Sequence, residues 1–124
     1  MARLSIFTTV IVLLTQPGVA LAGDPQRGAS IFQARCSMCH SAVRNGPPNF
    51  GPNLFGIVGR KPGIVPSFEY SGAMRATGTP WSVDRIEAYV EDPAKVIPGV
   101  RMSDTGVHDA DARHDLVAYL ATLK

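Results

Sequence analysis

Two cysteines, Cys36 and Cys39, stand two residues apart and are followed at once by His40. Two thiols at this spacing can add across the two vinyl groups of a haem. The adjacent imidazole then lies under the iron, where its nitrogen can serve as an axial ligand. The order Cys-x-x-Cys-His is the attachment signature of c-type haem. The sequence therefore predicts one covalently bound haem c.

Other interpretations of the cysteine pair fit less well. A disulfide is the ordinary expectation for two cysteines in an exported protein, but the spacing argues otherwise. A thioredoxin-like redox pair expects a βαβ context, which this chain lacks. A zinc site needs a second pair of ligands at suitable spacing, whereas His108 and His114 are isolated residues.

The sixth position of the iron decides between electron carriage and ligand binding, and a methionine sulfur there raises the reduction potential. Met1 falls in an N-terminal leader described below, and Met38 is tied inside the attachment motif. Met74 and Met102 remain as candidates. Because an isolated methionine is usually core filler, spacing alone does not choose between them.

Three helices are expected to position these residues. The first begins at Asp24, an N-cap followed by proline, and ends at the cysteine motif. The second begins after Ser82 and must stop before Pro93. The last begins near Asp109 or Asp111, where acidic residues suit a helix N-terminus.

The forty residues from 41 to 80 are punctuated by glycine and proline and show no strong periodicity. A compact domain seldom carries such a stretch unless something other than protein fills its centre. No strand alternation is evident elsewhere. The architecture expected from the residues is therefore all-α with long loops.

The first 22 residues have the features of an export signal. Arg3 supplies a basic start, residues 4–14 are apolar apart from Ser and Thr, and Ala20-Leu21-Ala22 matches a cleavage site. The apolar run is shorter than the roughly 20 residues that a spanning helix needs. We expect cleavage after Ala22, a periplasmic location, one domain of residues 23–124 and no stable membrane insertion.

The charge of the chain is nearly balanced. Twelve Lys and Arg stand against ten Asp and Glu, and loss of Arg3 with the leader leaves a net charge near +1. Two ionised haem propionates would bring the holoprotein to about −1. Nucleic-acid binding needs a concentrated basic face and is not expected.

Several separated motifs resemble, in order, those of the class I cytochromes c, the mitochondrial and bacterial c2-like group. The resemblance runs from about residue 23 to residue 124. It is carried by the Cys36-to-His40 motif, Gly51-Pro52-Asn53-Leu54, Gly59-Arg60-Lys61, Phe68-Glu69-Tyr70, Trp81, Tyr89 before Pro93, Ile97-Pro98-Gly99 before Met102, and Asp115-Leu116-Val117-Ala118-Tyr119-Leu120. It implies the class I cytochrome c fold, with three to five helices and long loops wrapped around one covalent haem.

The resemblance also implies roles for individual residues. Met102 resembles the second axial ligand, on the haem face opposite His40. Pro52 resembles the residue whose carbonyl accepts the other ring N–H of His40. Tyr89 corresponds to the phenol near the axial sulfur. The residues that resemble those holding the haem propionates are Arg60, Tyr70 and Trp81.

Three positions depart from the usual pattern of the family. Met74 stands where Asn is frequent, and Val100 stands where Thr is usual, so two hydrogen-bonding groups near the haem are missing. Asp104 replaces an aromatic residue just after the ligand. The basic ring around the haem edge is also thin, and the residues that remain of it are Arg35, Lys95 and Arg101.

Three functions are weighed on this basis. The first is a monomeric, non-enzymatic periplasmic carrier of single electrons between a donor and an acceptor protein. The second is a haem protein with a labile sixth position that reacts with ligands or peroxide. The third is a haem c subunit of a larger oxidoreductase complex. The Pro98-Gly99-x-x-Met102 turn favours the first over the second, and nothing in the sequence separates the first from the third.

Overall fold

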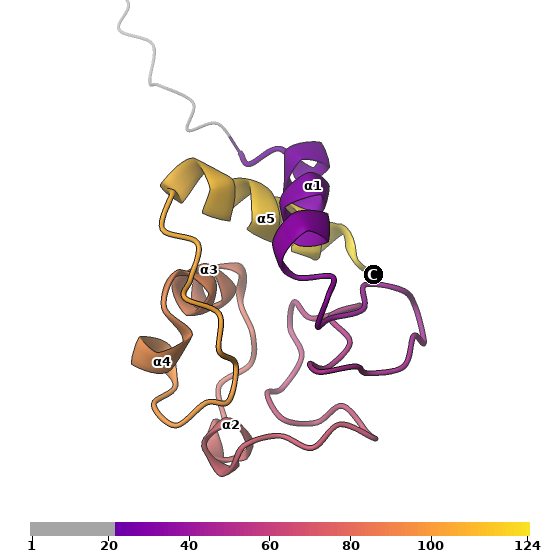
Figure 1. The fold of residues 1–124 in the computed structure, drawn as a ribbon, viewed down its shortest axis with the longest axis vertical. Coiled ribbons are helices and arrows are strands. Elements are labelled where there is room, and N and C mark those ends of the chain that lie inside the picture. Colours follow the sequence, from indigo (N-terminus) through magenta and orange to yellow (C-terminus); the bar gives the residue numbers. More distant parts are fainter. Residues whose placement is uncertain (1–21) are drawn as a thin grey trace, which may run out of the picture.

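The computed structural model describes residues 22–124; residues 1–21, which are all but the last residue of the predicted leader, lie outside the described residues. The described part of the chain contains five helices joined by loops and no strand (Figure 1). The helices are α1 (Pro25–Arg35), α2 (Gly72–Ala76), α3 (Val83–Glu91), α4 (Pro93–Val96) and α5 (Ala110–Thr122). The all-α prediction is confirmed. In residues 22–124 no helix is both long and apolar enough to cross a bilayer.

The three longer helices begin at residues that the sequence predicts as N-caps. Asp24 precedes α1, Ser82 precedes α3 and Asp109 precedes α5. Each side chain accepts a hydrogen bond from a backbone N–H two or three residues later. These bonds satisfy donors that have no partner within the first turn of a helix.

Two short helices lie where the sequence analysis places none. Ser71 begins α2 by accepting a hydrogen bond from the backbone N–H of Met74. Asp92 and Pro93 begin α4 with the same Asp-Pro arrangement that begins α1. Helices of four or five residues are too short to show an apolar period, so their caps are the only signal in the sequence.

The two terminal helices, α1 and α5, cross closely (Figure 1). A Cβ on Gly28 would lie 1.9 Å from the carbonyl oxygen of Asp115, so only glycine allows the two backbones this approach. One turn further along, the rings of Phe32 and Tyr119 pack with their centroids 5.4 Å apart. α3 also packs against α5 and against α4, which joins the crossing to these two helices.

An ion pair reinforces the crossing. Arg27 Nε donates to Asp115 Oδ2 over 2.7 Å, and the backbone N–H of Asp24 donates to Asp115 Oδ1 over 2.6 Å. These two bonds, from α1 and from its N-cap, hold the pKa of the Asp115 carboxyl below its ordinary value. The carboxylate of Asp115 therefore ties the start of α1 to α5.

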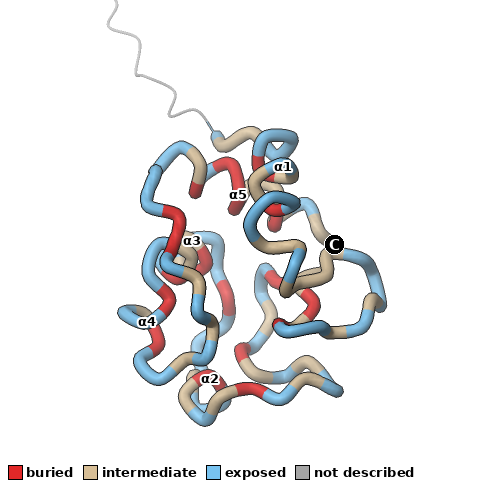
Figure 2. The backbone as a smooth tube through the Cα atoms, in the orientation of Figure 1, coloured by how far each residue is buried: buried red, intermediate tan, exposed pale blue. Residues whose placement is uncertain are grey.

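The hydrophobic core is wrapped around a cavity. Nine of the twelve buried hydrophobic side chains in the described region line it. They come from α1, α2, α3, α5 and the loops on either side of α2. Figure 2 shows the buried segments distributed over both halves of the molecule. The fold is thus built around a site.

Candidate functional site

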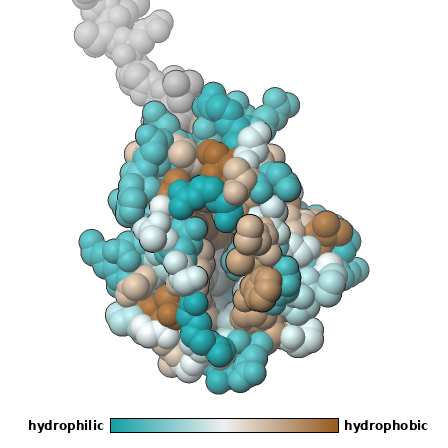
Figure 3. All heavy atoms as spheres, viewed as in Figure 1, coloured by the Kyte–Doolittle hydropathy of each residue, from teal (hydrophilic) through white to brown (hydrophobic). Residues whose placement is uncertain are grey.

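The cavity has a volume of about 840 Å³ and opens to the surface as a hollow between the two halves of the molecule (Figure 3). Its size falls in the upper part of the range of about 300–1,000 Å³ that is usual for ligand pockets. Its wall is mostly aromatic and aliphatic, with a few polar groups. This combination suits a large, mainly apolar group with polar ends.

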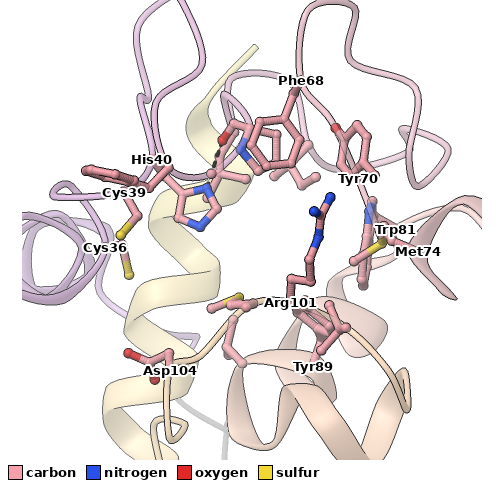
Figure 4. Close-up of a pocket in the computed structure, with 18 of the residues that line it drawn as sticks. Cys36, Cys39, His40, Phe68, Tyr70, Met74, Trp81, Tyr89, Arg101 and Asp104 are labelled. Carbon is pink, nitrogen blue, oxygen red and sulfur yellow. Dashed lines mark hydrogen bonds between the residues drawn. The ribbon is translucent and has the colours of Figure 1, made fainter. Parts of the chain in front are cut away.

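Cys36, Cys39 and His40 lie together on one wall, in the turn that follows α1 (Figure 4). The backbone N–H groups of Cys39 and His40 both donate to the carbonyl of Cys36, over 3.0 and 2.8 Å. This tight turn brings all three side chains to the cavity. The two sulfurs are not joined in a disulfide, so both are available to a bound group.

The chemistry of the two cysteines argues against the alternative interpretations. Burial, with a smaller contribution from Asp104, raises the pKa of Cys36 to about 11. A redox-active pair needs one cysteine whose pKa is lowered, and the surroundings of Cys36 act in the opposite direction. In residues 22–124 no three His, Cys, Asp or Glu side chains are grouped as a zinc site requires.

The His40 imidazole is held in a tautomer and an orientation that suit binding to a metal ion. Its Nδ1 lies 2.8 Å from the carbonyl oxygen of Pro52, and since that oxygen can only accept, Nδ1 carries the proton. Burial lowers the pKa of His40, so the ring is neutral near pH 7. The other nitrogen, Nε2, therefore keeps its lone pair for a metal. The Pro52 carbonyl therefore sets the tautomer of the ring, as the hydrogen-bonded partner of a ligating histidine does.

Both candidate methionines line the cavity. Met74 is buried next to Trp81 (Figure 4), and Met102 is half-buried in the loop after α4. The rings of Trp81 and Tyr89 meet edge to face, with centroids 5.0 Å apart. Burial raises the pKa of Tyr89 to about 12, which keeps its phenol neutral. This part of the wall is accordingly apolar and uncharged.

The polar groups of the cavity wall include Arg60 and Tyr70, as the sequence predicts. Arg60 donates to the carbonyl oxygens of Asn53 and Phe55, over 2.8 and 3.2 Å. Burial lowers the pKa of Arg60. An arginine remains charged even so, and a half-buried guanidinium is a strong partner for a carboxylate. The Tyr70 hydroxyl accepts a hydrogen bond from the backbone N–H of Val65.

Two features of the site have no counterpart in the sequence analysis. Gly51 packs against the ring of His40, and Arg35 pairs with Asp104 at the cavity. For Gly51 the available signal is its place immediately before Pro52. The charged pair is 69 residues apart in the chain, so no spacing could have indicated it.

Comparison with known proteins gives consistent results. The family model described as Cytochrome c matches residues 25–124. Cytochrome c2 of Rhodopila globiformis is 41% identical over 107 residues, which cover 86% of this chain and 100% of that protein. Cytochrome c of Gibberella zeae is 41% identical over 98 residues, which cover 79% of this chain and 92% of the relative. Cytochrome c type-1 of Ascaris suum is also 41% identical, with coverages of 79% and 87%.

The cavity fits the prosthetic group that this similarity implies. Two thiols line its wall, a neutral imidazole has a free lone pair, and a cation is available for an acidic substituent. The predictions of covalent haem and of a cytochrome c fold are confirmed. The chain belongs to the cytochrome c family of electron-transfer proteins, and it carries one haem c attached covalently through Cys36 and Cys39.

Proposed function

We propose that this protein is a monomeric periplasmic carrier of single electrons between a donor and an acceptor protein, with His40 and Met102 as the axial ligands of the haem iron. The observation that carries the proposal is the anchored imidazole of His40, which faces a cavity lined elsewhere by the loop that bears Met102. The haem supplies the one-electron chemistry. With both axial positions filled, no site is left for a substrate, so the protein is not an enzyme.

The surrounding residues have supporting roles in this proposal. Pro52 fixes the tautomer and the orientation of the His40 ring. Tyr89 lies beside the axial sulfur. The residues that hold or neutralise the haem propionates are Arg60, Tyr70 and Trp81. Their shared position on the cavity wall supports this assignment.

Substitution of each methionine tests the ligand assignment. Met102→Ala should abolish the weak sulfur-to-iron absorption band of the ferric protein in the far red and should open the iron to imidazole. Met74→Ala should keep the band but lose roughly 2–5 kcal/mol of stability, because it leaves a void in a buried position. If Met74→Ala abolishes the band and Met102→Ala does not, the assignment is reversed.

Export and partner binding are tested on the native protein. N-terminal sequencing of protein from the periplasm should begin at Gly23 if cleavage follows Ala22. The alternative function, a haem c subunit of a larger oxidoreductase complex, is favoured by two exposed apolar side chains, Met38 and Phe50, which are 78% and 81% exposed. Purification from native cells under mild conditions separates the two, because a carrier arrives alone and a subunit arrives with its complex.

A further inference from the structure

The loop that bears Met102 is attached to the rest of the molecule on both sides of that residue. Before Met102, Arg101 Nη2 donates to the carbonyl oxygen of Glu69 over 2.5 Å. After it, Asp104 pairs with Arg35 at the end of α1. The two attachments reach different parts of the fold, one before α2 and one on α1.

The attachment to α1 is made of several bonds. Arg35 Nη2 lies 3.1 and 3.4 Å from the two carboxylate oxygens of Asp104, and it also donates to the carbonyl of Gly106 over 3.1 Å. Asp104 Oδ1 accepts a hydrogen bond from the backbone N–H of Gly106 over 2.7 Å. The carboxylate therefore both shapes its own loop and binds the neighbouring helix.

The position of this ion pair links the two ends of the haem site. Arg35 directly precedes Cys36, and Asp104 follows Met102 by two residues. Both line the cavity, and Figure 4 shows Asp104 on the same side of it as Cys36. Beyond Asp104 the chain is fixed again, because Val107 N–H donates to the carbonyl of Val90 in α3 over 2.8 Å. The pair thus spans from the haem-attachment turn to the methionine loop.

We propose that Arg35 and Asp104 form a clasp that holds the Met102 loop closed over the haem, and that both are positioning residues for the sixth iron ligand. The clasp rests on the proposed ligation by Met102. Its charged side chains are 37% and 31% exposed, so water and salt weaken it without abolishing it. It occupies the position where the sequence departs from the family by placing Asp104 after the ligand.

The test is the rate at which imidazole binds the ferric holoprotein, because imidazole can reach the iron only when the methionine loop opens locally. Asp104→Asn keeps an oxygen for the Gly106 N–H and removes the charge. It should bind imidazole about two- to fivefold faster than the wild type, the range that a partly exposed ion pair can supply. Arg35→Gln should do so at least as strongly, since it also loses the bond to Gly106. Arg35→Lys should largely restore the slow rate.

Two comparisons make the test specific. Raising the ionic strength should speed imidazole binding to the wild type but leave Asp104→Asn almost unchanged, since only the wild type has a pair to screen. The double variant Arg35→Gln/Asp104→Asn should be no faster than Arg35→Gln, because both changes remove the same interaction. Asp84→Asn is the control, as it makes the same charge change at an exposed site outside the cavity.

The possible failures are distinguishable. A wild type without the far-red sulfur band, or a band that survives Met102→Ala, would overturn both the ligand assignment and the clasp. A normal band with imidazole rates in Asp104→Asn and Arg35→Gln equal to the wild type would overturn the clasp alone. Equal acceleration by Asp84→Asn would also overturn it, because net charge would then explain the effect.

Discussion

Gly51 lies directly against the imidazole of His40, and a Cβ built on Gly51 would stand 2.4 Å from the ring Cε1. The backbone N–H of Gly51 donates to the carbonyl of Cys39 over 2.8 Å, and the next residue, Pro52, accepts the ring proton. Glycine therefore leaves the space that the axial ring occupies, while its neighbours hold that ring in place.

We expect Gly51→Ala to displace the His40 ring. The variant should yield less covalently attached haem, and the holoprotein that forms should be less stable by roughly 1–3 kcal/mol, the usual cost of overpacking. Thermal unfolding and the ferric absorption spectrum check this. Gly78→Ala is a matched control because nothing lies within 4 Å of a Cβ at that position. A Gly51→Ala protein with wild-type yield, Tm and spectrum would contradict the argument.

The ion pair between α1 and α5 predicts a dependence of stability on pH. Arg27 and the Asp24 N–H lower the folded-state pKa of Asp115 below its ordinary value of 3.8. A carboxyl whose pKa is depressed by folding contributes stability above about pH 4 and loses that contribution as the pH falls through the folded value. Asp115→Asn should therefore have a lower Tm than the wild type at pH 7, and the difference should shrink in acid.

The Asp115→Asn experiment needs Tm values of both proteins from pH 7 down to about pH 3, a range that spans the ordinary carboxyl pKa. Asp84→Asn, which removes an exposed carboxylate, should follow the wild type across this range. A Tm difference for Asp115→Asn that is constant with pH would show that the carboxylate charge contributes nothing.

The central cavity predicts that the chain folds only with its haem. At about 24 cal/mol per Å³, an empty space of 840 Å³ would cost about 20 kcal/mol, more than the 5–15 kcal/mol by which domains are usually stable. Water that enters through the open mouth of the cavity reduces this free-energy cost. Half of the cost would still be enough to offset the stability of a typical domain. Cys36→Ala/Cys39→Ala purified without haem should therefore lack most helical signal in far-UV circular dichroism. A cooperative, fully helical apoprotein would refute the prediction.

The charges around the haem predict a weak dependence of electron transfer on salt. The full chain has a net charge of only +2, and Arg35, one of three basic residues expected around the haem edge, is paired with Asp104. Long-range steering needs an unbalanced field. Stopped-flow rates with the native partner should change only severalfold between low and physiological ionic strength. A fall by orders of magnitude would mean that Lys95 and Arg101 suffice to steer the protein.

Apolar contact should supply more of the partner binding. Phe50 is 81% exposed at the cavity, and Asn49 Nδ2 donates to the carbonyl of Met38 over 2.9 Å, which brings the neighbourhood of Phe50 close to the exposed Met38. Phe50→Ser should lower the second-order rate with the native partner by about tenfold, the effect of losing a central aromatic contact. Ile64→Ser removes an exposed apolar side chain that does not line the cavity and should have little effect. Equal losses in both variants would rule out a specific apolar docking area.

The parts of this fold that could be predicted are those with a local chemical signal. The caps Asp24, Ser82 and Asp109 begin helices because their side chains satisfy nearby N–H groups, and this depends only on adjacent residues. The short helix α4 carries the same Asp-Pro signal, but four residues show no apolar period, and Pro93 also marks the end of α3. The motif from Cys36 to His40 can be recognised in the sequence because haem attachment requires residues that are close together in the chain.

Other features depend on segments that meet only in the folded chain. No regular spacing in the sequence indicates these contacts. They are the approach of Gly51 to His40, the clasp between Arg35 and Asp104, and the hydrogen bonds of Arg60 in the cavity wall. Their geometry is set by loops that pack around the cavity. Resemblance to a family can point to such residues one by one, but only coordinates show which of them touch.

The crossing of α1 and α5 has a consequence for the order of biosynthesis. Leu116 and Leu120 of α5 form part of the cavity wall, yet they are synthesised after the segment that carries Cys36 and Cys39. The segment with Cys36 and Cys39 emerges some eighty residues earlier. Until α5 is synthesised, Gly28 lacks its partner helix and one part of the cavity wall is missing. The cysteine segment therefore exists before the cavity can close, and docking of α5 completes the wall around the haem.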